Sequence, residues 1–213
     1  MKPIVVALAV SAAWATIPHQ PALLLHPDDP AFAAEAPAVS HLRMDTTKGT
    51  IRLEMERKWA PHGVDRFYAL ATHGYYNDTA IFRVRAGAFA QFGINGDPAV
   101  AKAWRTRTIP DERRVLSNVR GTIAFAFAVP NGRTTQVFIN LRDNSAADDP
   151  EPFVPFARIT EGMDVADAFY AGYAERAGGG IRAGKQDPVF AGGNALWRRD
   201  FPKLDYIRAI TAE

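Results

Sequence analysis

The chain has 213 residues, of which 47% are hydrophobic and 23% charged, and its formal net charge is +2. These values are typical of one globular domain with a sizeable core, and they exclude a wholly disordered chain. Scattered lysine and arginine give no indication of a nucleic-acid partner, and the lack of cysteine excludes a disulfide framework and a thiolate nucleophile.

The N-terminal region has the composition of a secretory leader. Lys2 precedes an apolar run from Ile4 to Ile17, and the residues after it are rich in alanine and proline. This run is too short to span a bilayer comfortably, so we expect no stable membrane insertion. We predict a leader over residues 1–33, a linker over 34–41 and a periplasmic or secreted protein. An uncleaved extension on a cytoplasmic protein is the alternative.

The next segments combine strand and helix patterns. Residues 42–54 alternate apolar and polar around Gly49, which predicts a hairpin with one buried face. Apolar side chains at helical spacing between Pro61 and Gly74 predict an amphipathic helix. A second helix is expected from Gly162 to about Ala174. Two helices and six to eight strands favour a mainly β fold, a closed antiparallel barrel with helices at its ends.

Residues 82–93, FRVRAGAFAQFG, carry the strongest indication of a site. If they form one extended segment, Arg83, Phe89 and Gln91 share one face, because side chains alternate along a strand. The opposite face, with Phe82 and Phe92, is then core. A guanidinium, a neutral amide and an aromatic ring on one surface suit the binding of an apolar residue by its backbone, without a nucleophile.

Five blocks resemble the cyclophilin-type peptidyl-prolyl cis-trans isomerases, in the order found in that family, over roughly residues 42–175. These are RMDTTKGTIRLEME (43–56), APHGVDRFYALATHGYYND (60–78), the 82–93 run, GTIAFAFAVPNGRTTQVFIN (121–140) and PFVPFARITEGMDVADAFY (152–170). The resemblance implies a closed antiparallel eight-stranded cyclophilin-like barrel capped by two α-helices. The rest, residues 176–213, is expected to be a Gly-rich loop and a C-terminal tail packing on or beside this barrel.

The resemblance also implies a function and a set of site residues. It implies rotation about X-Pro peptide bonds, with Arg83 and Gln91 as catalytic residues and no metal or cofactor. Arg83 would donate a hydrogen bond to the prolyl nitrogen in the twisted transition state. The implied substrate-binding residues are Phe89, Ala126, Phe127, Gln136, Phe138 and Phe153. The expected partners are proline-containing peptides and unfolded client proteins, bound by a monomer that assists the folding of exported proteins.

Two departures from the family pattern leave a second function open. Ala88 stands where the family has a larger residue, and the stretch DDPEPF (148–153) replaces a segment that normally supplies an aliphatic side chain. Both changes favour a weakly active or inactive module, or chaperone, that binds proline peptides. The presence of Arg83, Gln91 and Gln136 favours the isomerase.

Overall fold

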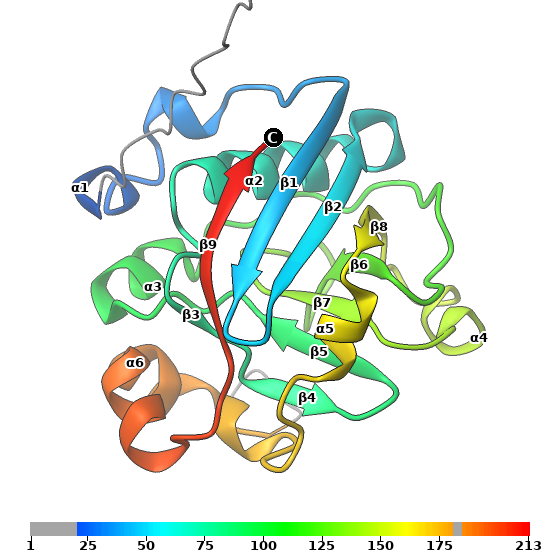
Figure 1. The fold of residues 1–213 in the computed structure, drawn as a ribbon. Coiled ribbons are helices and arrows are strands. Elements are labelled where there is room, and N and C mark those ends of the chain that lie inside the picture. Colours follow the sequence, from blue (N-terminus) through cyan, green and yellow to red (C-terminus); the bar gives the residue numbers. More distant parts are fainter. Residues whose placement is uncertain (1–20, 181–184) are drawn as a thin grey trace, which may run out of the picture.

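A computed structural model describes residues 21–180 and 185–213 of the chain, and a curled sheet forms the centre of the folded body, with helices around it (Figure 1). Nine strands form one sheet, in which every pair is antiparallel. They are β1 (Val39–Thr46), β2 (Thr50–Glu56), β3 (Thr79–Ala80), β4 (Arg83–Arg85), β5 (Phe89–Phe92), β6 (Thr122–Phe125), β7 (Val137–Asn140), β8 (Pro155–Glu161) and β9 (Tyr206–Ala212). The mainly β class and the first hairpin are confirmed.

The sheet curls, but backbone hydrogen bonds do not join its two edge strands into a closed barrel. Its strand order is β3-β9-β1-β2-β8-β6-β7-β5-β4, and within the described residues no ladder joins β3 to β4. The expectation of a closed eight-stranded barrel is therefore wrong in both strand number and closure. The edge strand β3 has only two residues. Next to it, the ring of Phe82 is stacked on Trp197, so side chains occupy the gap that a ladder would close.

The expected cap of two helices is also wrong. The structure has α1 (Pro21–Leu24), α2 (Pro61–Thr72), α3 (Pro98–Trp104), α4 (Ser145–Asp148), α5 (Met163–Asp167) and α6 (Asp187–Asp200), with 3-10 turns η1 (Pro30–Phe32), η2 (Arg57–Trp59) and η3 (Arg176–Gly178). The first predicted helix corresponds to α2, whereas the second is only the short α5. Helix α6, which is kinked at the non-helical Gly193, lies where we expected a loop and a tail. The sequence did not predict it because proline and glycine are typical helix breakers.

Residues 82–93 form a hairpin and not one extended segment. Strand β4 pairs with β5 so that Arg83 lies opposite Gln91, and Gly87 in the turn has a φ of +64°, which glycine adopts readily. Residues directly opposite each other in an antiparallel pair share a face. The prediction of one extended segment is therefore wrong. Its consequence still holds, because the hairpin also places Arg83 and Gln91 on one face.

Two apolar clusters hold the body together. The larger lies inside the curled sheet and includes buried residues of α2, among them Phe67 and Leu70. The smaller contains Phe82, Phe190 and Trp197 and lies where α3 and α6 contact each other at one side of the sheet (Figure 1). The smaller cluster is built largely by residues 168–205, which we call the α5–β9 connection; its residues 181–184, part of the predicted Gly-rich loop, lie outside the described residues.

The segment before β1 packs on the larger cluster. Leu24 is 1% exposed, and its carbonyl accepts a 2.8 Å hydrogen bond from the Trp104 indole. Phe32 also packs against Trp104, with ring centroids 4.8 Å apart. Of the predicted leader, residues 1–20 lie outside the described part of the chain. Among the helices of the described part, none has the length and apolar character needed to cross a membrane.

Candidate active site

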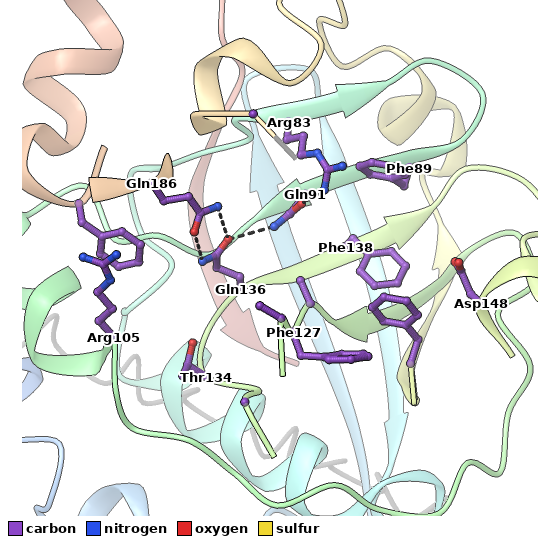
Figure 2. A pocket seen from close by; sticks show the side chains of 16 residues that line it. Arg83, Phe89, Gln91, Arg105, Phe127, Thr134, Gln136, Phe138, Asp148 and Gln186 are labelled. Carbon is purple, nitrogen blue, oxygen red and sulfur yellow. Dashed lines mark hydrogen bonds between the residues drawn. The ribbon is translucent and has the colours of Figure 1, made fainter. Parts of the chain in front are cut away.

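One cavity of about 730 Å³ opens over strands β4, β5 and β7, a volume typical of ligand sites. Sixteen of the described residues line it, which are Arg83, Phe89, Gln91, Arg105, Ala126, Phe127, Ala128, Gly132, Thr134, Gln136, Phe138, Asp148, Phe153, Gly180, Gln186 and Phe190. Figure 2 shows aromatic rings at one end of this cavity and the Arg105 guanidinium at the other, with three glutamines between them. The cavity is therefore an elongated groove with an apolar and a polar end.

Hydrogen-bonded polar side chains run along the middle of the groove. Arg83 donates from Nη1 to Gln91 Oε1 at 2.9 Å, and Gln91 donates from Nε2 to Gln136 Oε1 at 3.0 Å (Figure 2). The β4–β5 register places Arg83 opposite Gln91. Because Gln91 lies opposite Phe138 across β5 and β7, Gln136, two residues earlier in the chain, is on the same face.

The Arg83 guanidinium is held on three sides. Besides Gln91, Nη2 donates to Glu175 Oε1 at 2.8 Å, and the guanidinium carbon lies 4.7 Å from the centroid of the Phe89 ring, a cation–π distance. The side chains of Arg83 and Glu175 are only 18% and 21% exposed, so water screens this ion pair less than a surface pair. Arg83 therefore presents a fixed positive charge at the rim of the apolar end.

Four phenylalanines form the apolar end. Phe153 lies between Phe127 and Phe138, with ring centroids 4.6 Å and 5.3 Å away, and Phe138 contacts Phe89 at 6.3 Å. These distances are those of ordinary offset or edge-on aromatic pairs. The rings supply the apolar surface that the departures at Ala88 and at residues 148–153 had put in doubt, since Phe153 ends the latter stretch and Ala88 is not among the lining residues.

Asp148 is the only carboxylate among the lining residues. Partial burial raises the pKa of Asp148, and the charge of Asp149 beside it raises that pKa further. Asp149 is not among the lining residues. It accepts hydrogen bonds from the backbone and side-chain nitrogens of Asn118, both at 2.9 Å. The two carboxylates thus have different surroundings although they are adjacent in the chain.

The polar end contains residues that sequence reasoning missed. Arg105, which follows α3, lies with its guanidinium carbon 4.3 Å from the Phe190 ring centroid and forms an ion pair with Asp187. Gln186, at the start of α6, exchanges two hydrogen bonds with Gln136, of 3.0 and 3.2 Å. No motif in the sequence pointed to these residues, because they reach the groove only through the packing of α3 and the α5–β9 connection.

The structure brings all eight predicted site residues to this one cavity. Arg83 and Gln91, predicted to be catalytic, lie side by side, and the six predicted substrate-binding residues are among its lining residues. Their roles remain predictions. A fixed guanidinium, amides and an aromatic wall can bind peptide carbonyls and an apolar ring. In the described part of the chain, no three His, Asp or Glu side chains cluster in a way that could hold a metal ion.

Comparison with known proteins gives a consistent result. Residues 41–182 match the family model described as cyclophilin type peptidyl-prolyl cis-trans isomerase/CLD. Over 142 residues the chain is 32% identical to peptidyl-prolyl cis-trans isomerase A of Dickeya dadantii, covering 65% of this chain and 74% of that protein. It is 31% identical to peptidyl-prolyl cis-trans isomerase B of Escherichia coli, covering 57% and 79%.

A similar fold occurs among solved structures. The crystal structure of a cyclophilin type peptidyl-prolyl cis-trans isomerase from Cryptosporidium parvum superposes with a TM-score of 0.58 at 19% identity, over 82% of this chain and 98% of that one. At this identity the likeness concerns the fold alone. It supports the curled antiparallel sheet as the common framework.

Proposed function

This chain belongs to the cyclophilin-type peptidyl-prolyl cis-trans isomerase family and is an enzyme of that type, and we propose that it rotates X-Pro bonds in exported proteins as they fold, with Arg83 as the central catalytic residue. Gln91 and Gln136 hold the backbone of the substrate on either side of the bond. Phe89, Phe127, Phe138 and Phe153, with Ala126 at their edge, hold the proline ring.

The reaction requires the loss of amide resonance. That resonance gives rotation about a peptide bond a barrier of about 18 to 20 kcal/mol, whereas the cis and trans forms of an X-Pro bond differ by only about 0.5 to 1 kcal/mol. In the twisted transition state the prolyl nitrogen becomes pyramidal and regains a lone pair. A hydrogen bond from Arg83 to that lone pair stabilises the twisted state and not the planar one, which is the differential binding that catalysis requires.

The observation that carries the proposal is the position of the Arg83 guanidinium. It is restrained by Gln91 at 2.9 Å and lies over the Phe89 ring, beside the wall that Phe138 and Phe153 complete. We propose that a proline ring binds against this wall with its nitrogen toward Arg83. Because the donor is already oriented, little reorganisation is needed in the transition state.

Proline-containing segments are the substrate class that we propose. A second crystal structure of the Cryptosporidium parvum isomerase was determined in the presence of the dipeptide Ala-Pro. The groove here has the apolar end that such a ring requires and amides that can bind the neighbouring carbonyls. We propose that unfolded client proteins supply these segments and that a monomer acts on them.

Export rests on the N-terminal sequence. Lys2 and the apolar run from Ile4 to Ile17 support a cleavable leader and a periplasmic or secreted location. The burial of Leu24 favours cleavage before this residue, since cleavage after residue 33 would remove it from the core. N-terminal sequencing of the mature chain from fractionated cells tests this; an intact N-terminus in the cytoplasm would contradict it.

The first experiment measures cis-to-trans exchange of a short X-Pro peptide by NMR with wild type, Arg83→Ala and Arg83→Lys. One charge-assisted hydrogen bond contributes about 1.5 to 3 kcal/mol, so we expect Arg83→Ala to lower kcat/KM by about one to two decades. Arg83→Lys keeps the charge without the planar guanidinium, so we expect its kcat/KM to lie between those of wild type and Arg83→Ala.

Circular dichroism of each variant provides the folding control. If folded wild type binds the peptide and does not accelerate exchange, the catalytic proposal is wrong, and the chain is a module or chaperone that binds proline peptides. Full activity of a folded Arg83→Ala variant would instead remove Arg83 from the mechanism and leave the isomerase assignment intact.

A further inference from the structure

The polar network of the groove has both of its ends in the α5–β9 connection. At one end Arg83 donates to Glu175, and at the other Gln136 exchanges two hydrogen bonds with Gln186. Between them, Arg83, Gln91 and Gln136 are linked through the sheet, as the dashed lines between the three glutamines show in part in Figure 2. Five side chains thus form one continuous chain of hydrogen bonds.

Glu175 is attached to a firmly packed turn. Its carbonyl accepts hydrogen bonds from the backbone nitrogens of Gly178 at 3.2 Å and of Gly180 at 2.9 Å. Ala177, within this turn, is fully buried, and its carbonyl accepts a 2.7 Å hydrogen bond from the Trp197 indole. The carboxylate therefore reaches Arg83 from a segment that both backbone and core contacts hold in place.

Gln186 is similarly restrained. It is only 7% exposed although it lies at the first turn of α6, where its carbonyl accepts hydrogen bonds from the backbone nitrogens of Val189 and Phe190. Val189 and Phe190 belong to the smaller apolar cluster. The amide of Gln186 is thus held against Gln136 by a helix whose apolar face is anchored in the core.

The types of these residues fix the direction of every hydrogen bond. A carboxylate only accepts and a guanidinium only donates, so Glu175 and Gln91 Oε1 both accept from Arg83. Gln91 Nε2 must then face Gln136 Oε1, and Gln136 Nε2 is left to donate to Gln186. With the two ends occupied, neither sheet glutamine can turn its amide over without losing a hydrogen bond.

Given the isomerase function proposed above, on which this inference rests, we propose that Glu175 and Gln186 are positioning residues that hold Arg83 and Gln136 in the orientation required for catalysis. Neither residue is needed to touch the substrate. Glu175 restrains the guanidinium plane while the second N–H of each Nη group stays free for the reaction, and Gln186 holds the Gln136 amide in place through two hydrogen bonds, whose direction is set by Arg83 through Gln91. The α5–β9 connection is then part of the catalytic apparatus.

The central experiment compares Glu175→Gln with wild type in the full-length protein. An amide keeps the size of the side chain and loses the charge, so we expect kcat to fall about tenfold and KM to stay within about twofold. Glu175→Asp, which keeps the charge, should recover part of this loss. The matched control is Asp200→Asn, since Asp200 pairs with the exposed Arg199 on the same connection and should leave both constants unchanged.

A merely structural role would give a different pattern. In an Arg83→Ala background, Glu175→Gln should change kcat/KM by less than about twofold, because the residue it positions is gone. We expect Gln186→Ala to lower kcat less than Glu175→Gln does, since a neutral hydrogen bond is weaker than a charged one. Loss of stability alone would lower activity equally in both backgrounds.

A spectroscopic measurement tests the contact without any activity assay. The side-chain N–H signals of Arg83 should show slow rotation of the guanidinium in wild type and faster rotation in Glu175→Gln. Unchanged kcat and unchanged Arg83 signals in Glu175→Gln, with Arg83→Ala inactive, would overturn this inference and leave the proposed function standing. A rise in kcat would also overturn it, because Glu175 would then hold Arg83 away from the substrate. If wild type itself is inactive, the proposed function fails, and with it the positioning role.

Discussion

Arg83 has its site because of its cross-strand partner and not because of its immediate neighbours. Its register opposite Gln91 places both side chains in the groove, and its charge is matched by Glu175, 92 positions away. Arg83 Nε is buried and has no hydrogen-bond partner among the described residues. Most buried donors in proteins are hydrogen-bonded, because an unsatisfied donor lowers stability. Sites of this kind trade some stability for a fixed functional geometry.

Asp148 gives a prediction at this same scale. Burial raises its pKa above the usual 3.8, with Asp149 adding to the effect. As the pH rises through this range, the unfolded chain releases the proton before the folded chain does, so ionisation favours unfolding. We expect Asp148→Asn to raise the Tm slightly at pH 7, with the difference from wild type vanishing well below pH 3.8. Thermal unfolding across this pH range measures it.

Asp149→Asn serves as the opposing control. Burial acts to raise the pKa of Asp149, but its hydrogen bonds from Asn118 outweigh burial and lower the pKa. This carboxylate therefore stabilises the fold at neutral pH, and its replacement should lower the Tm at pH 7. Changes of the same sign in the two variants would show that their surroundings do not differ as described.

At the scale of elements, the α5–β9 connection does two things at once. Its apolar side chains fill the gap between the sheet edges β3 and β4, as the stack of Phe82 on Trp197 shows, with centroids 5.7 Å apart and planes 5° from parallel. Its polar side chains, Glu175 and Gln186, end the network in the groove. Substitutions in the smaller apolar cluster should therefore alter the positions or mobility of Glu175 and Gln186 in the groove.

Trp197→Phe tests this coupling. The ring can still stack on Phe82, but the hydrogen bond to the Ala177 carbonyl is lost. Leaving a buried carbonyl without its partner costs about 1 to 3 kcal/mol, so we expect urea unfolding to show a loss of that size. Hydrogen exchange should be faster in residues 176–180, next to Glu175. Trp59→Phe, outside the connection, is the control and should leave exchange in residues 176–180 unchanged. Unchanged exchange there in Trp197→Phe would argue against the coupling.

At the scale of the whole molecule, the body is held by contacts between distant parts of the chain. Strand β9, near the C-terminus, pairs with β1, and the segment around Leu24 covers Trp104. Both ends of the described chain therefore contribute to one folded unit. Glu112 adds another long-range contact, since it accepts from the first backbone nitrogens of α2, at His62 and Gly63, and forms an ion pair with the buried Arg133.

Leu24→Ala tests the contribution of the N-terminal segment. Truncating a buried leucine to alanine typically costs about 2 to 5 kcal/mol, and Leu24 is fully within the core. We expect a loss in the lower part of that range, because a terminal segment can detach locally. The neighbouring Leu25 is 45% exposed, so Leu25→Ala should have little effect. Equal Tm values for the two variants would mean that the segment does not belong to the folded body.

The sequence by itself identified which residues form the candidate site. Alternation placed Arg83, Phe89 and Gln91 on one face, and the hairpin keeps them there because three residues separate the paired Arg85 and Phe89, and an odd loop preserves the order of faces. The full set of eight site residues was implied by the family resemblance, and all of them line one cavity, although residues 82–93 were wrongly expected to form one strand. The first hairpin and α2 were predictable from local periodicity, since their periods are read within a few residues.

Only the tertiary structure decided how the sheet ends and what closes the site. The open edge at β3 and β4 and the helix α6 depend on packing between distant parts of the chain, and the contacts of Glu175 and Gln186 join residues 92 and 50 positions apart. No periodicity within a short window carries such information, and the proline and glycines of α6 obscured even the helix itself. Local order came from the sequence pattern, whereas the restraint of Arg83 depends on which distant surfaces pack together.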